Sequence, residues 1–446
     1  MRKVSLLVIL CLTGVFKIHG QDTGMIDPES NLDSLSAQAQ LGGDGYREGQ
    51  YPGLGRAASE IFYSDKRVAF SGYAELANVF NGGEPRDTSS EDLELFFSQL
   101  YRVTPFIGVR INESIFLTTE LGIEYLEGNG ESEVHFFPEV YMDFIVKKWM
   151  SFRAGLQPLN IGYINNNEEP LLFQSVNRPE TERLILPTEW IEAGVTAYGD
   201  LFNKFNYALG FTNGILAKDF RSASWIRGGA EGQLESWNKL AINAQVNYLP
   251  VNNLTLSAST YYNESGRGEE ITTDEGTKNV SAPVFVFSGY ARWDYRAFSL
   301  IGMGTYGTLG ETPEVYRLTE ASQGVGQVLG EEAYGFYIEP SLDLLKVFGK
   351  SHSNEVKSGN MFTLSNPELP LFVRYERLDT HSSVAPELQD LDYVRSNLNI
   401  WMVGVNYKPN HFFALKFDVR FRDNLDPQGD VPESETLYEL GIGIEF

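Results

Sequence analysis

The last nine residues of the chain alternate between large apolar side chains and polar or small ones without a break. The apolar set ends on an aromatic residue and comprises Tyr438, Leu440, Ile442, Ile444 and Phe446. Because successive side chains of a β-strand point to opposite faces, such a segment has one apolar face and one polar or bare face. We therefore expect the chain to end on an amphipathic strand, with no polar tail after it.

The same alternation recurs from Arg67 to the C-terminus and predicts sixteen strands. In residues 411–423, an apolar face of phenylalanine, leucine and valine opposes Lys416, Asp418, Arg420 and Arg422. Burying four charges in a dry core would be prohibitive, so we expect the polar face to meet water and the apolar face to meet lipid. The predicted strands span 67–81, 92–111, 114–126, 132–147, 149–157, 188–199, 203–214, 238–249, 253–263, 283–295, 298–308, 332–346, 370–380, 395–408, 411–423 and 435–446.

Short and long connections alternate between these strands, as they do in barrels with short periplasmic turns and longer external loops. Lipid cannot satisfy the open edge of a sheet, so the strands are expected to close on themselves. The fold class predicted is an all-β, transmembrane, antiparallel barrel of about sixteen strands. Eighteen is the alternative, because the connection 347–369 is long enough to contain a further hairpin. After residue 20, no stretch approaches the roughly 18 consecutive apolar residues that a membrane helix needs.

The N-terminus has the layout of a secretory signal peptide. Arg2 and Lys3 precede an apolar run over 4–16, and Gly20 offers a small residue before a cleavage point. We divide the chain into a signal peptide (1–20), a flexible or partly helical periplasmic lead-in rich in serine and glycine (21–66), and the barrel (67–446). The single cysteine, Cys11, falls within the signal, so the mature chain has no thiol or disulfide.

Charge and motif content narrow the function classes. A formal net charge of −25 argues against nucleic-acid binding, which needs basic patches. The mature chain has histidines at 135, 352, 381 and 411, and none has a neighbour at metal-ligand spacing. His381, beside Asp379 and Ser382, is the one candidate for a hydrolytic site, and we interpret it as polar surface. We expect no catalytic residue, no metal, no cofactor and no enzymatic activity.

The C-terminal strand resembles the closing strand of Gram-negative outer-membrane β-barrels. This resemblance implies that the strand ending in Phe446 is read by the barrel-assembly machinery, and it places the protein in the cell outer membrane among lipid and lipopolysaccharide. Acidic residues gather in the predicted external loops, as at Asp423, Asp426, Asp430 and Glu433. They suggest divalent cations shared with lipopolysaccharide, with a solvated and mutually repulsive surface as the alternative.

Residues 150–230 are similar to a porin family distantly related to the phosphate-selective porins. The similarity rests on the positions Gly155-Leu156-Gln157-Pro158, Asn165, Glu169-Pro170, Arg178-Pro179, Glu182-Arg183, Leu186-Pro187-Thr188 and Trp190-Ile191-Glu192, with later echoes at Asn213-Gly214 and Arg374-Tyr375-Glu376-Arg377. A histidine that this family carries before the Glu-Pro pair is replaced by Glu168, so its role does not transfer.

In sixteen-stranded general porins, the third external loop folds inward and narrows the lumen. Here that loop is 158–187. The resemblance implies a pore constriction formed by Glu168, Glu169, Arg178, Glu180, Glu182 and Arg183. It also implies a possible homotrimer, the usual assembly of porins of this size.

The predicted lumen wall carries both signs of charge, through Arg102, Arg110, Glu120, Glu124, Glu139, Asp143, Arg153 and Glu192. Acidic side chains outnumber basic ones over the whole predicted inner face, which favours weak cation selectivity. The alternative is that these charges pair across strands without setting selectivity. The function expected is a passive diffusion porin for small hydrophilic solutes or ions. The alternatives are a substrate-specific channel for oxyanions or sugars, and a closed surface barrel used for adhesion or anchoring.

The signal peptide yields a first prediction. Cleavage is expected after Gly20, which leaves Gln21 as the first residue of the mature protein. Mass spectrometry of the protein purified from outer membranes would locate the cleaved bond. Since Ile18 is large for a position near the bond, a shift by a few residues is tolerable. A mass that retains residues 1–20 would contradict the prediction.

Overall fold

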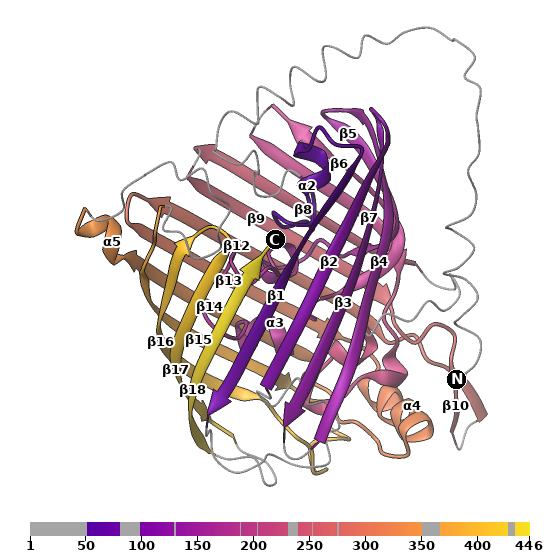
Figure 1. The fold of residues 1–446 in the computed structure, drawn as a ribbon. Coiled ribbons are helices and arrows are strands. Elements are labelled where there is room, and N and C mark those ends of the chain that lie inside the picture. Colours follow the sequence, from indigo (N-terminus) through magenta and orange to yellow (C-terminus); the bar gives the residue numbers. More distant parts are fainter. Residues whose placement is uncertain are drawn as a thin grey trace, which may run out of the picture.

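The computed structural model describes residues 51–80, 99–128, 131–187, 189–202, 204–230, 240–251, 253–273, 276–349, 366–426 and 433–446. The predicted signal peptide and most of the predicted lead-in lie outside these ranges. The described chain forms one closed antiparallel barrel of sixteen strands (Figure 1). The predicted fold class is confirmed.

The barrel strands agree closely with the predicted ones. They are β1 (Val68–Phe80), β2 (Gln99–Asn112), β3 (Ile115–Gly128), β4 (Glu131–Lys147), β5 (Met150–Pro158), β6 (Ile191–Leu201), β7 (Phe205–Asn213), β8 (Leu240–Val251), β9 (Leu254–Glu264), β12 (Pro283–Tyr295), β13 (Phe298–Leu309), β14 (Glu332–Asp343), β15 (Pro370–Ser383), β16 (Asn397–Asn410), β17 (Phe413–Asn424) and β18 (Ser434–Glu445).

Each strand pairs with the barrel strands before and after it, and β1 pairs with β18 to close the sheet. The alternative of eighteen barrel strands is therefore wrong. The extra hairpin considered within 347–369 falls mainly on residues outside the described ranges. A different hairpin, between the predicted strands 253–263 and 283–295, is formed by β10 (Glu270–Thr273) and β11 (Gly276–Asn279) and stands as a separate two-stranded sheet.

One predicted strand is too long for a local reason. The segment 332–346 was expected to be a single strand, but β14 ends at Asp343. The carboxylate of Asp343 accepts hydrogen bonds from the backbone N–H groups of Leu345 and Lys346, and so caps the short helix α5 (Leu344–Val347). An aspartate at this position favours a helix start over a continued strand.

The barrel wall is apolar outside and polar inside. On β17, Phe417 points outward and is 44% exposed, whereas its neighbours Lys416 and Asp418 are 2% and 0% exposed. The same contrast separates Val103 from Arg102 on β2. This is the reverse of a water-soluble protein and suits a wall that meets hydrocarbon on its outer face.

The helices of the described residues lie outside the barrel strands, with the first ahead of β1 and the others in the connections. They are α2 (Glu60–Tyr63), α3 (Glu180–Leu184), α4 (Thr312–Gln323) and α5, with 3-10 turns η2 (Ile164–Asn166), η3 (Ala217–Asp219), η4 (Ser222–Ser224) and η5 (Arg227–Ala230). Within the described part of the chain, no helix has the length and apolar character needed to cross a membrane. Helix α2 contacts β1 and β2, and α3 contacts β14 and β15, while α5 contacts β14, which it follows in the chain.

The seam between the first and last strands depends on Phe446. Its backbone exchanges two hydrogen bonds with Gly72 of β1, at N···O distances of 2.8 and 2.9 Å. A Cβ atom at Gly72 would lie 2.6 Å from both the Phe446 ring and the backbone oxygen of Thr104. The ring thus covers the glycine, as an aromatic side chain can in a sheet that lacks a side chain at one position.

This packing predicts that Gly72→Val weakens the seam. The added side chain meets the backbone of β2 and the Phe446 ring, so we expect a loss of about 1–3 kcal/mol in the free energy of unfolding. Urea unfolding in lipid vesicles, followed by tryptophan fluorescence, would measure it. Gly304→Val on β13 is the matched control, because a Cβ atom there meets nothing closer than 3.8 Å. Equal midpoints for the two variants would contradict the proposed packing.

Candidate functional site

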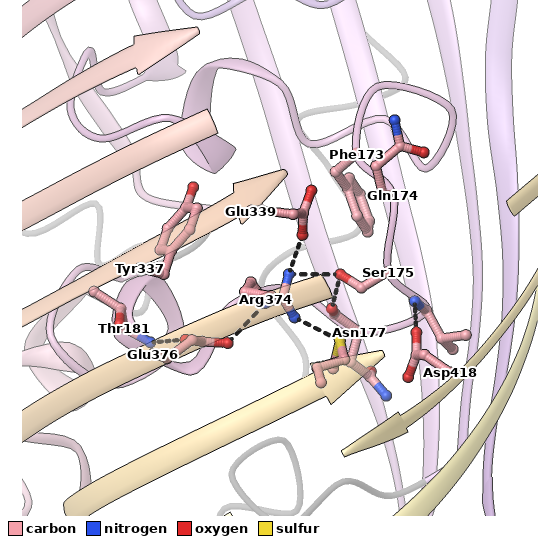
Figure 2. Close-up of polar contacts among 12 residues, drawn as sticks. Phe173, Gln174, Ser175, Asn177, Thr181, Tyr337, Glu339, Arg374, Glu376 and Asp418 are labelled. Atoms are coloured by element: carbon pink, nitrogen blue, oxygen red, sulfur yellow. Dashed lines mark hydrogen bonds and ion pairs between the residues drawn. The ribbon is translucent and has the colours of Figure 1, made fainter. Parts of the chain in front are cut away.

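A segment between β5 and β6 runs across the inside of the barrel. We name residues 159–187 and 189–190 the crossing segment. The backbone N–H of Val176 donates to Asp418 Oδ2 at 2.7 Å, and that of Thr181 donates to Glu376 Oε2 at 3.1 Å. Glu376 lies on β15, which is eight strands from β5 in either direction around the barrel. The segment therefore contacts the wall opposite the strand from which it departs (Figure 2).

Arg374 of β15 is a centre of this contact. Its guanidinium lies 3.1 Å from Glu339 and 2.9 Å from Glu376, and it donates to Ser175 Oγ at 2.8 Å. Figure 2 shows the guanidinium between the two wall carboxylates and the crossing segment. Lys416 of β17 adds a hydrogen bond to the backbone oxygen of Ser175 at 2.9 Å. Two cations on the wall thus hold one serine of the segment.

Helix α3 of the crossing segment is fixed by a second group of charges. The Glu180 carboxylate lies 3.1 Å from Arg420 and 2.9 Å from Arg422, both on β17. The same arginines reach Glu439 and Glu435 of β18, each at 3.0 Å. An ion pair this well buried gains little net stability, but removing one partner would leave an uncompensated charge. Moving α3 would therefore leave buried charges without a partner, so the network fixes the position of this helix.

Glu182 fixes the fold of the crossing segment itself. One carboxylate oxygen accepts the backbone N–H groups of Tyr163 at 2.8 Å and Ile164 at 2.7 Å, and the other accepts the Tyr337 hydroxyl at 2.7 Å. Burial raises the pKa of Glu182 to about 7, even though these hydrogen bonds favour the charged form. The side chain thus joins the start of the segment to α3 and to β14.

A third group of charges, the Arg102 cluster, comprises Glu75, Arg102, Glu124, Arg178 and Glu189. The Arg102 guanidinium on β2 lies 3.3 Å from Glu75, 2.8 Å from Glu124 and 2.7 Å from Glu189. Glu189 also pairs with Arg178 at 3.0 Å. Burial would raise the pKa of Glu189, but the two guanidiniums outweigh it and hold that pKa below its ordinary value. Glu189, near the end of the crossing segment, is thereby tied to the wall, and Arg178 joins the cluster through the same carboxylate.

The remaining predicted residues of the constriction and of the lumen wall are mostly buried. Glu169 and Arg183 are buried, whereas Glu168 is only partly buried and lies near Glu120 and Glu139, which face each other on β3 and β4. The other predicted wall residues, Asp143, Arg153 and Glu192, are buried on the inner face, and Arg110 is half-buried. Asp143 pairs with Arg153 at 3.0 Å and accepts the Tyr198 hydroxyl at 2.7 Å.

Three participants were missed by sequence reasoning. Glu189 was assigned to a predicted strand, yet it precedes β6 with a positive φ of 65°, which turns its side chain toward two arginines. The contacts of Ser175 could not be predicted from the sequence, because a single serine in a loop does not indicate a partner. Arg374 is one of the positions on which the family resemblance rests. Its role as a centre of contacts was missed, because only the fold brings its partners close to it.

Residues 51–63, which we name the N-terminal segment, belong to the range that the sequence analysis treats as a periplasmic lead-in. In the structure, Tyr51, Leu54, Ile61 and Phe62 are buried in one cluster with inner-face residues such as Phe116, Tyr141 and Tyr198. The glycine and serine content of this range hides the apolar positions that make the contact.

The interpretation of His381 as polar surface is wrong, because the ring lies inside the fold and both of its nitrogens have partners there. His381 is buried, its Nε2 lies 3.0 Å from the backbone oxygen of Val328, and its Nδ1 lies 2.9 Å from Thr380 Oγ1. The Ser382 hydroxyl instead donates to the backbone oxygen of Glu332. Across the described ranges, no group of three or more histidine and carboxylate side chains is arranged to hold a metal ion.

Comparison with known proteins supports the fold. No family model matches the chain. An uncharacterized protein of Aquifex aeolicus (strain VF5) is 28% identical over 387 residues, covering 84% of this chain and 80% of the relative. Among solved structures, Salmonella typhi OmpF in complex with daunomycin superposes with a TM-score of 0.51 at 10% identity, covering 85% of this chain and 97% of OmpF.

Two further structures give lower scores. The outer membrane channel DcaP of Acinetobacter baumannii has a TM-score of 0.48 at 8% identity, covering 85% of this chain and 97% of DcaP. An anion-selective porin from Comamonas acidovorans has a TM-score of 0.43 at 12% identity, covering 85% and 99%. The likeness to OmpF shows that the fold is of the outer-membrane porin type. The resemblance to the phosphate-selective porins stays a prediction.

The buried carboxyls of the crossing segment predict a pH dependence of stability. Burial raises the pKa of Glu182 to about 7 and that of Glu169 to about 8, from an ordinary value of 4.5. The folded state therefore binds protons that the unfolded chain has lost, and this stabilisation is full below pH 4.5 and is lost as the pH rises through 7 and 8. Unfolding midpoints in urea at pH 5, 7 and 9 are expected to fall in that order.

Glu182→Gln tests the source of this effect. A glutamine can accept the two backbone N–H groups with its oxygen and donate to Tyr337 with its amide, so it mimics the protonated carboxyl. The variant should show a flatter decline between pH 5 and 9 than the wild type. Glu387→Gln, at an exposed position between β15 and β16, serves as the control. An unchanged decline in Glu182→Gln would remove this residue from the explanation.

Proposed function

We propose that the protein is a passive diffusion channel of the outer membrane for small hydrophilic solutes and ions, with a weak preference for cations. The observation that carries this proposal is a closed wall with a polar inner face, crossed by a segment that ion pairs fix to opposite sides. Because the segment is held in place by these ion pairs, it narrows the lumen permanently. In this proposal the crossing segment is the third external loop, folded inward.

Buried amides on the inner face support a hydrated path. Gln157 of β5 and Asn243 of β8 are each 1% exposed, and none of their side-chain nitrogen or oxygen atoms has a hydrogen-bond partner among the described residues. A buried polar group without a partner costs about 1–3 kcal/mol. These amides make this part of the inner face polar, which suits hydrated solutes better than an apolar cargo.

The balance of charge favours cations. Three carboxylates of the Arg102 cluster stand against two guanidiniums. Rings of acidic side chains select cations and arginine clusters select anions, so the excess supports weak cation selectivity.

A second candidate is a closed barrel used for anchoring or adhesion. It is favoured by the inner face of β12 to β16, where Val286, Ile301, Tyr337 and Ile400 belong to a buried apolar cluster with residues of the crossing segment. An apolar filling of this kind obstructs hydrated solutes on that side. A specific path for oxyanions or sugars has no such support in the described contacts.

The partners follow from the proposed location. Outer-membrane lipid and lipopolysaccharide surround the wall, the assembly machinery reads the strand ending in Phe446, and a homotrimer is the proposed assembly. The outward residues Tyr438 and Leu440 of this strand are 47% and 45% exposed, which leaves them accessible for such recognition.

Ion selectivity provides the test. The refolded protein in a planar bilayer under a KCl gradient should give stable conductance steps with a reversal potential on the cation side. Glu75→Gln and Glu189→Gln each remove one acid from the Arg102 cluster and should lower the K⁺/Cl⁻ permeability ratio at least about twofold. Glu387→Gln, outside the lumen wall, should leave the ratio unchanged. Anion preference in the wild type would contradict the proposed selectivity, and a folded but silent protein would favour the closed barrel.

A further inference from the structure

The N-terminal segment is packed into the barrel by its aromatic residues. Tyr51 stacks on Phe62 with ring centroids 3.9 Å apart and planes 15° apart, and Phe62 lies 5.0 Å from Phe116 of β3. Tyr51, Leu54, Ile61 and Phe62 are all at most 7% exposed. Aromatic side chains of this size contribute much of the energy of a packed contact.

Hydrogen bonds attach the segment's backbone to the wall at several strands. Ser71 of β1 donates to the backbone oxygen of Ala57 at 2.6 Å, and Arg153 of β5 donates to that of Pro52 at 2.5 Å. Arg110 of β2 donates to the backbone oxygen of Ile61 at 3.4 Å. These bonds use side chains of the inner face, so the wall provides donors for carbonyl groups that would otherwise be buried without partners.

The wall also leaves room for the segment. A Cβ atom at Gly108 of β2 would lie 2.4 Å from the Cβ atom of Ile61, so only glycine allows this approach. A Cβ atom at Gly55 would meet the Glu169 carboxylate at 2.2 Å. Close fits on both partners indicate a specific seat for residues 51–63 rather than loose filling.

The N-terminal segment is connected to the crossing segment. The backbone N–H of Ala58 donates to Glu169 Oε1 at 3.2 Å. On the other side, Arg56 forms an ion pair with Glu445 near the end of β18. One short stretch of chain thus touches the wall on β1, β2, β5 and β18 and the segment that narrows the lumen.

We propose that residues 51–63 are a built-in plug, and that its release from the Gly108 seat opens the lumen to solutes. This inference rests on the proposed channel function. The plug joins β1 through residues 64–67 alone, so those four residues are the hinge about which it leaves its seat. The contacts described above are non-covalent, and the predicted mature chain has no cysteine, so release needs no chemical step.

Two variants release the plug by different routes. Gly108→Leu fills the seat of Ile61 from the wall, and Tyr51→Ala with Phe62→Ala removes the stacked pair from the plug. Gly304→Leu, where a Cβ atom meets nothing closer than 3.8 Å, is the control for placing leucine at a strand glycine. A band whose mobility on a gel changes after heating would verify that each variant forms a barrel.

Conductance and proteolysis are then measured on the same refolded full-length protein. Both release variants are expected to increase the single-channel conductance at least about threefold over the wild type and the control. They should also expose the bond after Arg56 to trypsin, because its side chain is 21% exposed and ion-paired while the plug is seated. Higher conductance together with cleavage after Arg56 in both variants would support the plug.

Three results would overturn the inference. If trypsin cuts after Arg56 in both variants while the conductance matches the wild type, the segment does not close the lumen, and the channel function stands. If neither variant exposes Arg56, the Gly108 seat and the stacked pair do not hold the segment. If no form of the folded protein conducts, the plug and the proposed channel function fail together.

Discussion

Pairing between the first and last strands is the interaction on which the rest of the structure depends. A sheet in lipid has no water to satisfy its edge groups, so β1 and β18 must find each other across the full length of the chain. The contact is completed at Gly72, whose missing side chain gives Phe446 a place to pack. Once the sheet closes, the side-chain alternation along every strand has one consequence, an apolar outside and a polar inside.

The polar side chains of the inner face then need hydrogen-bond and ion-pair partners. Here many of these partners come from segments outside the barrel strands. Arg374, Arg420 and Arg102 each bridge wall carboxylates to the crossing segment or extend its network. Desolvating such ions offsets most of their mutual attraction, so the networks add less stability than their number suggests. Their effect is positional, because a segment displaced by a few ångströms would leave several charges buried without a partner.

Two segments from different parts of the sequence occupy the interior. The crossing segment is held by charges, whereas the N-terminal segment is held by aromatic packing and by hydrogen bonds to its carbonyl groups. These forces differ in how they respond to change. Displacing one partner of a buried ion pair leaves the other charge uncompensated, so such pairs resist displacement strongly, whereas a stacked aromatic pair on a short tether can separate and return. The contact of Glu169 with Ala58 joins the two systems.

The sequence by itself determined the barrel. Period-two alternation and the rhythm of short and long connections are local properties, and they predicted sixteen strands and placed most inward residues, including Arg102, Glu139 and Arg153. Only the tertiary structure decided which of these charges meet. Ser175 contacts Arg374 and Lys416, which lie 199 and 241 residues away in the sequence. The side chain of Glu189 reaches Arg102 because its backbone has a positive φ. Ile61 packs over Gly108. Contacts of this kind depend on the closure of the barrel and on steric fit, and neither leaves a periodic signal along the chain.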